Sequence, residues 1–526
     1  MDRPHASWPF QEAARVKLDR LGPEDPVIFE TGFGPSGRPH LGTFAEVART
    51  IMVQNAFGEL HPELADRTRL YVFCDDMDGL RKVPANLPNR DLLQDRLAKP
   101  ISRIPDPFGC CASYSDHMEK ELISFLSRFG FKFELKSSAV EYAAGAFNPG
   151  LHLVLARLDQ IKELILPTLQ EENQETWSPI IPVCENCGKL YTTVVTGVDA
   201  AADEVGYECT GSFGEGEREV KGCGHRGRVS IKNGKVKVGW KVDWALRWIV
   251  YRVRYEMFGK DLIDSARLSG KIARLLGGVP PEGMTYEMFL DETGKKISKS
   301  VGEGLTVDAW LDYAPIESLL YFLFQNPKKQ RRLFFDAIPK CVDDYLEELK
   351  KYPTLDETAR MDSLAWHLQR LGRPGIAYSS RINFSLILNL ISAIGAGDPV
   401  LLKEYLRRYD PGADRNPEIM SEMISRAARY FKDYIEPAKK YRAPSAEERA
   451  WLEAILQKLG AYQGDSEDEL QAIVFDAAKE KGADAKAVFK AFYEVMLGQE
   501  RGPRFGTFVK LVGRAKAMEM MRSRLG

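Results

Sequence analysis

The sequence contains little cysteine and no long hydrophobic segment. Its 526 residues include 8 cysteines, and apolar runs long enough to cross a membrane are absent. Cysteines that follow no disulfide-dense pattern argue against a small secreted scaffold and suit a reducing cytoplasm. The N-terminal residues 1–20 also lack the apolar core of a signal peptide. We therefore expect a cytoplasmic protein that does not enter a membrane.

An excess of either charge is absent too. The chain has 73 Lys and Arg residues against 75 Asp and Glu residues, so its formal net charge is −2. This balance neither requires nor excludes a polyanionic partner, and only local basic patches could bind a nucleic acid. A hydrophobic content of 44% is ordinary for a globular protein, and 526 residues are too many for one core. We expect three or more domains.

The most informative segment, residues 27–57, joins a predicted strand to a predicted helix. Val27–Phe29 is apolar, as a buried strand would be, and is followed by a loop that contains Gly32, Gly34 and Gly37. After Pro39, apolar residues recur at steps of three and four, which predicts an amphipathic helix. His40 and Gly42 are expected in its first turn, where unpaired N–H groups favour phosphate. An ordinary strand–helix turn that binds nothing is the alternative.

A second segment lies far downstream, at residues 291–300. It reads DETGKKISKS and follows the hydrophobic residues 286–290. A charged run is usually a solvated surface, and by itself this run does not show whether the segment binds a ligand. However, P-S-G-x-x-H-x-G after a first strand, followed by K-I-S-K-S, resembles the paired signature of class I aminoacyl-tRNA synthetases. The resemblance implies an α/β Rossmann-type catalytic domain with a parallel sheet, in which the two segments close over ATP from opposite sides.

The chemistry that this resemblance implies needs no general base. When an aminoacyl adenylate forms, the amino acid's own carboxylate is the nucleophile, so the protein supplies positioning and stabilises charge on phosphate. We expect the catalytic residues to be His40, Lys296 and Lys299. Mg²⁺ is expected to bridge the phosphates. The residues expected to bind the nucleotide are those of the two signatures: Gly32, Gly34, Pro35, Ser36, Gly37, His40, Gly42, Thr43, Ser298 and Lys299.

A cysteine-containing stretch between the two signatures predicts a metal site. Cys184 and Cys187 form a C-x-x-C pair, and Cys209, Cys223 and His225 follow. Thiolates grouped in this way bind Zn²⁺ at about 2.3 Å. The stretch has too few large apolar residues to form a core of its own. Metal binding, which contributes about 10 to 16 kcal/mol, would stabilise the stretch instead. We predict a structural zinc held by four cysteines, or by three cysteines and His225. Free thiols are the alternative.

Three further segments indicate which class I synthetases the chain resembles. W-x-V-D-W-A-x-R-W at 240–248, F-G-K-D at 258–261 and D-G-L-R-K-V-P at 78–84 together resemble class I lysyl-tRNA synthetases of the archaeal and alphaproteobacterial type. The resemblance implies L-lysine and tRNA(Lys) as substrates. One position departs from the family, because Leu262 stands where histidine usually follows G-K-D. A polar contact expected at that position is therefore absent.

Selection of lysine requires a carboxylate or an aromatic face for an ammonium group on a flexible stem. The candidates in this sequence are Glu30, Trp240, Asp243 and Tyr286. For Glu30 and Asp243, a helix cap or an internal ion pair fits the sequence equally well. The four-residue steps between Trp240 and the next two tryptophans also fit a packing stripe along one helix face.

The C-terminal part is expected to be helical throughout. Two Ser-x-x-Glu patterns, beginning at Ser445 and Ser466, mark helix starts. Residues 384–394 are apolar but too short to span a membrane, so we expect a buried core helix. A helical region after the catalytic half resembles the anticodon-reading region of the family.

The expected organisation has four regions. Residues 1–110 form the first half of the Rossmann catalytic domain, and residues 111–235 an inserted connective region with a zinc ribbon-like segment at 184–225. Residues 236–325 complete the catalytic domain, and residues 326–526 form an all-helical tRNA- and anticodon-binding region. The sequence does not show the oligomeric state, and a monomer is the favoured expectation. Two other functions remain open: another class I synthetase, for example for glutamate, or a synthetase-like RNA-binding protein without catalysis.

Overall fold

The apolar segment that opens the first signature forms a central strand of a parallel sheet. The structure, a computed structural model, describes residues 5–19, 21–214, 219–295, 305–371, 377–395 and 397–526. The sheet has the order β11-β1-β2-β3, and all neighbouring strands are parallel. Its strands are β1 (Val27–Phe33), β2 (Thr68–Cys74), β3 (Glu134–Ser137) and β11 (Val253–Glu256). The predicted Rossmann-type sheet is confirmed.

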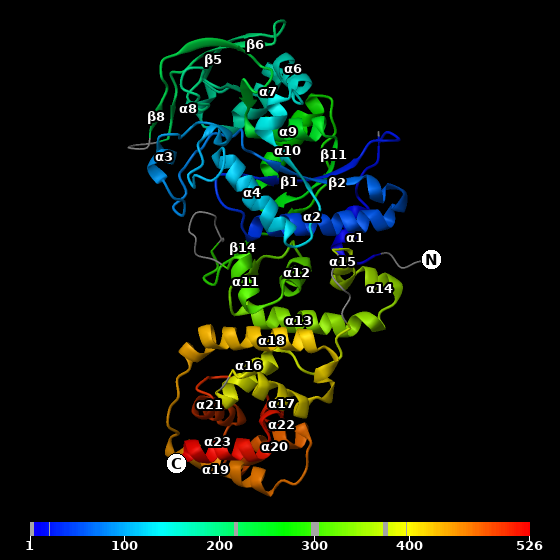
Figure 1. The fold of residues 1–526 in the computed structure, drawn as a ribbon, viewed down its shortest axis with the longest axis vertical. Coiled ribbons are helices and arrows are strands. Elements are labelled where there is room, and N and C mark those ends of the chain that lie inside the picture. Colours follow the sequence, from blue (N-terminus) through cyan, green and yellow to red (C-terminus); the bar gives the residue numbers. More distant parts are fainter. Residues whose placement is uncertain (1–4, 20, 215–218, 296–304, 372–376, 396) are drawn as a thin grey trace. The chain divides into compact units, whose positions relative to one another are not determined.

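Helices cover both faces of this sheet (Figure 1). Successive strand residues point to opposite faces, and Ile28 and Phe29 show the consequence. Phe29 packs against Phe57 of α2, whereas Ile28 belongs to a core cluster that contains Leu246 of α9 and Ile272 of α10. The helices are α2 (Leu41–Leu60) and α4 (Tyr114–Ser127) on one face, and α9 (Trp240–Val250) and α10 (Ile263–Leu275) on the other.

The order of the strands places a switch point beside β1. The chain runs from β1 to β2 to β3 in one direction, and β11 then pairs with the other edge of β1. In open α/β sheets, ligands bind beyond the carboxyl ends of the strands at such a point. The strand ends of β1 and β11, where Glu30 and Glu256 are register partners, are therefore where a ligand is expected.

The region inserted between β3 and β11 carries small antiparallel sheets. β4 (Ile180–Pro182) pairs with β10 (Val236–Val238), and β5 (Val194–Asp199), β6 (Glu204–Glu208) and β9 (Arg226–Ser230) form another sheet. A further pair consists of β7 (Ser212–Phe213) and β8 (Val220–Lys221). Before them lie α6 (Asn148–Ala156) and α7 (Leu158–Ile165).

The chain forms two compact units, which we describe separately. Unit 1 comprises Met1–Val307, Leu323–Phe334 and Asp356–Gly375. It also contains α1 (Trp8–Ala13), α14 (Glu357–Met361), α15 (Leu364–Arg370) and two short parallel pairs: β12 (Phe258–Gly259) with β13 (Thr285–Tyr286), and β14 (Phe289–Leu290) with β15 (Arg331–Arg332). The expectation of an all-helical region at residues 326–526 was wrong at β15, because the basic residues 331–332 add a strand to unit 1.

Unit 2 comprises Asp308–Phe322, Phe335–Leu355 and Ile376–Gly526, and the elements described within it are helical. Its longer helices are α13 (Ala337–Lys351), α16 (Phe384–Ile394), α17 (Pro399–Tyr409), α18 (Pro417–Tyr430), α19 (Ala446–Ala461), α20 (Glu467–Glu480), α21 (Ala485–Met496), α22 (Phe505–Val512) and α23 (Arg514–Leu525). The capping box that opens α19 at Ser445 is confirmed, and α16 is buried as predicted.

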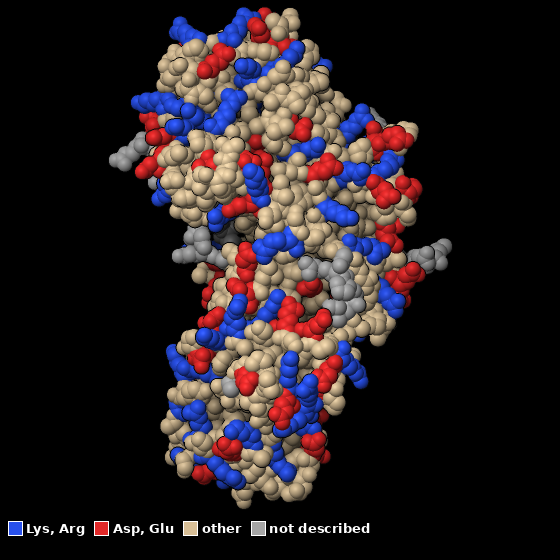
Figure 2. Space-filling model, in the orientation of Figure 1, with Lys and Arg blue, Asp and Glu red and all other residues tan. Residues whose placement is uncertain are grey.

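Figure 2 shows Lys and Arg side chains interspersed with Asp and Glu side chains over the visible face, in keeping with the small net charge. Among the described residues, no single helix is long and apolar enough to cross a membrane. The pair α16 and α17 passes that test only jointly, and it is bent by 117° at the break.

Candidate functional site

The end of β1 and the loop that leads to α2 present backbone to open space. A Cβ atom added at Gly32, Gly34 or Gly37 would meet nothing within 4 Å, and none of the three has a positive φ. Packing within the protein therefore does not require glycine at these positions. A ligand that approaches the backbone closely, such as a nucleotide phosphate, would account for all three.

His40 caps α2, whereas the sequence predicted that it would lie within the first turn. Its Nδ1 accepts hydrogen bonds from the N–H groups of Gly42 at 2.9 Å and Thr43 at 3.2 Å. Because Nδ1 accepts, the proton of the neutral ring lies on Nε2, which makes Nε2 a donor. A Cβ atom at Gly42 would lie 2.7 Å from Cε1 of His40. Gly42 is therefore needed to admit the imidazole ring, a role that the sequence did not reveal.

The rest of the signature loop is held by α4 and the segment before it. The Tyr114 hydroxyl donates to the backbone oxygen of Ser36 at 2.8 Å. Arg38 pairs with Glu121 at 3.3 Å, and its guanidinium lies 5.2 Å from the centre of the Phe108 ring. The loop is thus positioned by side chains that lie some 70 to 80 residues further along the chain.

Tyr286 is brought to the same loop through Glu46 of α2. The Tyr286 hydroxyl donates to Oε2 of Glu46 at 2.5 Å, and the Gly32 N–H donates to Oε1 at 3.2 Å. Burial, together with Glu46, raises the pKa of Tyr286 well above its usual range, so the hydroxyl keeps its proton. Two predicted site residues, Gly32 and Tyr286, therefore meet at a carboxylate that the sequence analysis did not single out.

Buried charges gather at the carboxyl ends of β1, β2 and β11. Glu30 is completely buried, and Nε of Arg247 lies 3.6 Å from its Oε1. Arg247 also donates to Asp75 at 3.1 Å and lies over the ring of Phe73. Glu256, opposite Glu30 in the sheet, is buried as well. One arginine thus stands between carboxylates from two neighbouring strand ends.

A buried lysine extends this group. Lys237 of β10 pairs with Asp78 at 2.6 Å and with Asp243 at 3.6 Å, and the Tyr142 hydroxyl donates to Asp243 at 2.5 Å. An internal ion pair, one of the alternatives for Asp243, is therefore present. We call the following set the charge cluster: Glu30, Asp75, Asp78, Asp243, Glu256, Lys237 and Arg247.

The pKa values of the charge cluster are displaced by burial. Burial and the nearby Glu256 raise the pKa of Glu30 well above its usual range. Burial also raises the pKa of Asp75 to about 7, although Arg247 opposes the shift. Burial by itself would lower the pKa values of Arg247 and Lys237, but the surrounding carboxylates raise both. The charge cluster therefore keeps its two basic groups protonated and opposes the ionisation of all five of its acids.

Of the three tryptophans of α9, two are buried and one is exposed. The indole N–H groups of Trp244 and Trp248 donate to the same oxygen of Glu256, at 2.8 and 2.5 Å. Both rings are buried, as expected for a packing stripe. Trp240 is 38% exposed and lies 6.1 Å from Trp244, measured between ring centres. Of the three, only Trp240 offers a free aromatic surface.

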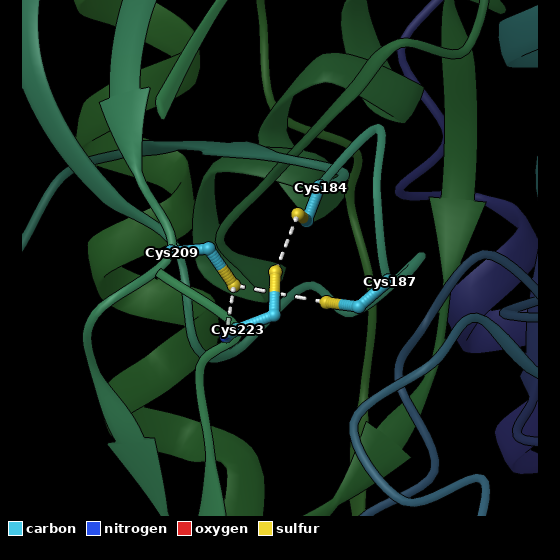
Figure 3. Close-up of side chains that lie close together, drawn as sticks. All are labelled: Cys184, Cys187, Cys209 and Cys223. Carbon is cyan, nitrogen blue, oxygen red and sulfur yellow. Dashed lines mark hydrogen bonds between the residues drawn. The ribbon is translucent and has the colours of Figure 1, made fainter. Parts of the chain in front are cut away.

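The four cysteines of the inserted region converge (Figure 3). Cys184 and Cys223 lie 3.7 Å apart, measured between Sγ atoms, and so do Cys187 and Cys209. A tetrahedral ion with ligand distances of about 2.3 Å would need sulfur–sulfur edges of roughly 3.8 Å, so the four thiols fit Zn²⁺. A hydrogen bond from Asn186 lowers the pKa of Cys223 to about 6. His225 does not belong to the group, and its ring packs near Tyr207.

A second group able to hold a metal was missed by the sequence analysis. Its members are Asp106, Cys110, Cys111 and His117. Nδ1 of His117 lies 3.2 Å from Sγ of Cys110 and 3.5 Å from Asp106, and Nε2 contacts Glu121 at 3.2 Å. Two adjacent cysteines, with an acid four residues before them and a histidine six after, were the signal in the sequence. This group adjoins the residues that hold the signature loop.

Part of the predicted site lies outside the described residues. Lys296, Ser298 and Lys299 fall in this category, so the structure does not place the second signature relative to His40. Leu262, the departure from the family pattern, packs against the hydrophobic core, as Phe258 does. Among the cluster members that the sequence analysis did not single out, Lys237 and Arg247 had a weak signal, since each interrupts a largely apolar run.

Comparison with known proteins agrees with the signatures. The family model described as "tRNA synthetases class I (K)" matches residues 6–372, and the "Anticodon binding domain" matches residues 391–525. Proteins named lysine–tRNA ligase from Rickettsia bellii (strain OSU 85-389) and Rickettsia felis are each 41% identical over 527 residues. The alignments cover 99% of this chain and 98% and 97% of those proteins.

A solved structure, of a glutamate tRNA ligase from Elizabethkingia meningosepticum, has 11% identity and a TM-score of 0.36, with 95% of this chain and 99% of that chain covered. That similarity is too low to carry an argument. The family model and the rickettsial relatives suffice, because they agree along nearly the whole length with a chain whose first signature opens a Rossmann-type sheet. The chain belongs to the class I tRNA synthetase (K) family, together with the lysine–tRNA ligases of Rickettsia.

Proposed function

We propose that the protein is a lysine–tRNA ligase, which activates L-lysine with ATP and transfers it to the 3′ end of tRNA(Lys). The observation that carries the choice of lysine is the charge cluster, in which five acids face two bases at the switch point of the sheet. A surplus of desolvated carboxylates attracts an ammonium group and repels a second carboxylate. The cluster therefore favours lysine over glutamate, and the names of the rickettsial relatives point the same way.

In this proposal the first signature binds ATP. The phosphates lie over the backbone of Gly32, Gly34, Pro35, Ser36 and Gly37, and His40 donates to them from Nε2. Gly42 and Thr43 hold the His40 ring by hydrogen bonding to Nδ1. The carboxylate of lysine attacks the α-phosphorus and pyrophosphate leaves. Mg²⁺, when bound, would neutralise charge on the phosphates.

The second signature completes the site. Lys296 and Lys299 neutralise the leaving pyrophosphate, and Ser298 helps to bind the nucleotide. For the amino acid, Glu30 and Asp243 supply negative charge, and Trp240 and Tyr286 supply aromatic surface. Because Leu262 is apolar, these residues would have to provide the polar recognition that histidine gives elsewhere in the family.

Two zinc ions are part of the proposal. Cys184, Cys187, Cys209 and Cys223 would hold a structural ion, which leaves no open position for chemistry. Asp106, Cys110, Cys111 and His117 would hold another, with Glu121 orienting the histidine. Both ions would stabilise the segments that carry them, and neither takes part in a chemical step. Reduced thiolates of this kind agree with a cytoplasmic location.

We also propose how the functions are distributed among the regions of the chain. Residues 1–110 and 236–325, together with α4 and β3, which cover and extend the central sheet, would form the catalytic domain, and residues 138–235 would be the inserted connective region. Residues 326–526 would bind tRNA and read its anticodon, which the match to an anticodon binding domain supports. We favour a monomer.

The decisive experiment is ATP–pyrophosphate exchange with each of the twenty amino acids, with tRNA(Lys) present. We expect exchange with lysine only, and a loss of about 100-fold or more in the Lys299→Ala variant, as for removal of a group that stabilises developing charge. Lys295→Ala is the matched control, because Lys295 precedes the signature and should be dispensable. Exchange with glutamate, or with no amino acid, would refute the proposal, and full activity of Lys299→Ala would refute the role of Lys299.

A further inference from the structure

The Glu30 carboxylate is buried without a hydrogen-bond donor. Both of its oxygens are inaccessible and accept no hydrogen bond from the described residues. Among the described residues, its one ion pair is with Nε of Arg247, and the separation of 3.6 Å is long for an ion pair. An ionised carboxylate in such surroundings is costly unless further positive charge or further donors are supplied.

The groups that face Glu30 supply neither further positive charge nor further hydrogen-bond donors. From β11 comes Glu256, whose carboxylate already accepts two indole N–H groups. From α9 come Arg247 and Asp243, and from the end of β2 comes Asp75. The hydroxyl of Tyr251, at the end of α9, is also close enough for Glu30 to raise its pKa. Three acids and a neutral phenol thus surround Glu30, with one arginine.

Lys237, the second base of the charge cluster, is already paired with other acids. Lys237 pairs with Asp78 and Asp243, and Tyr142 adds a donor to Asp243. With five acids and two bases, full ionisation would leave a surplus of three negative charges. Asp75 and Asp78 are partly exposed, so the cluster reaches solvent on their side.

We infer that the unliganded site holds a proton on the Glu30 and Asp75 pair, which share Arg247, and that the ammonium group of the substrate displaces it. Binding of lysine would then release a proton to solvent as the carboxylate gains a new cationic partner. The inference rests on the proposed function, because it takes lysine as the ligand. It adds a mechanism of selection: a substrate without a positive charge on its side chain cannot expel the proton.

The direction of the shifts agrees with this inference. The pKa of Asp75 is raised to about 7 and that of Glu30 is raised well above its usual range, which favours a proton on the pair near neutral pH. An arriving ammonium group lowers these pKa values. Lysine should therefore bind more tightly as the pH rises, and affinity should fall by up to about tenfold for each pH unit below the pKa of the unliganded pair.

The test is calorimetric titration of the full chain with L-lysine at pH 7, in buffers with different enthalpies of ionisation. The dependence of the observed heat on buffer gives the number of protons released. We expect about one proton at pH 7 and fewer as the pH rises above the pair's pKa. In Glu30→Gln we expect weaker binding by tenfold or more and a markedly smaller release. If that variant does not fold, Asp75→Asn tests the same pair.

The matched control is Glu119→Gln on α4. Burial raises the pKa of Glu119 to about 7, as for Asp75, but Glu119 lies outside the charge cluster. Its substitution should leave the release of protons unchanged. Saturable lysine binding without proton release from pH 6 to 9, or undiminished release in both Glu30→Gln and Asp75→Asn, would overturn the inference and leave the proposed function intact. Failure to bind or activate lysine at all would overturn both.

Discussion

The two units place their charges differently. In unit 1, Glu30, Asp243 and Lys237 are almost wholly buried, at one edge of the central sheet. In unit 2, representative ion pairs lie at the surface, as between Arg442 and Glu448, where the arginine side chain is 40% exposed. Burying an ion costs several kcal/mol, whereas an exposed pair costs and contributes little. In the proposed function, the buried charges of unit 1 bind the substrate, whereas exposed pairs such as those of unit 2 serve solubility and local order.

The groups able to hold metal follow the same division. Both belong to unit 1, and no such group occurs among the residues described for unit 2. Unit 2 instead relies on packed helices and caps, such as the box formed by Ser445 and Glu448. In unit 1, the cysteine-containing stretch contributes side chains such as Val205 and Tyr207 to a larger core cluster, and metal binding would stabilise it further.

The largest effect should come from removing a metal site. We expect the purified protein to contain two zinc ions per chain, and the Cys184→Ser/Cys187→Ser double variant to contain one. Because metal binding of about 10 to 16 kcal/mol would be lost, residues 180–238 should become open to protease and hydrogen exchange. The measurements are metal analysis by atomic emission and hydrogen exchange.

Cys341→Ser provides the control, since Cys341 lies in unit 2 and in neither group. It should retain both ions. A wild-type protein without zinc, or a double variant that keeps two ions, would contradict the comparison between the units.

Arg247→Met should have the next largest effect, because it leaves Glu30 and Asp75 without their shared cation. We expect a loss of about 3 to 5 kcal/mol in the free energy of unfolding of unit 1, measured by urea denaturation at pH 8, where the carboxyls are most ionised. At lower pH the loss should shrink, because both carboxyls have raised pKa values and take up protons.

Arg442→Met is the matched change in unit 2. Arg442 binds Glu448 and Glu494 at the surface, and we expect a loss of about 1 kcal/mol or less. The pKa of Glu448 is lowered from 4.5 to about 2, so the stabilisation is present above pH 4.5 and is lost as the pH falls toward 2. Equal losses for the two arginines would remove the distinction drawn between the units.

Gly42→Ala should have the smallest effect on stability and a selective effect on activity. The new methyl group would lie 2.7 Å from the His40 ring and displace it from the amides of α2. We expect kcat/KM for ATP to fall by about tenfold, which corresponds to roughly 1.4 kcal/mol, while helix propensity rises by up to about 1 kcal/mol. Gly58→Ala in the same helix is the control, since its nearest contact would be 3.4 Å, an ordinary separation. If both variants keep full activity, the His40 cap has no part in binding ATP.

Much of the fold could be predicted because local patterns determine it. The glycine-rich turn after Val27–Phe29, the apolar steps of α2 and the Ser445 cap each depend on neighbours in the chain, and the structure confirms all three. The partner of a strand could not be predicted in the same way. β10 is apolar in the same way as a central strand, but its partner is β4 and not β1. Periodicity identifies a strand and does not identify its partner.

By itself, the sequence determined the family, the Rossmann-type sheet and the order of the signatures, because these are written in residue types at short spacings. Only the tertiary structure decided which charges meet. Glu30, Asp75, Lys237 and Arg247 are separated by up to 217 residues, and nothing local reveals that they share one buried edge. The structure also decided that His40 binds the amides of its own helix and that the predicted cysteine group comprises the four cysteines without His225. The physical reason is that burial, which gives these polar groups their unusual properties, is a property of the whole fold and not of any one segment.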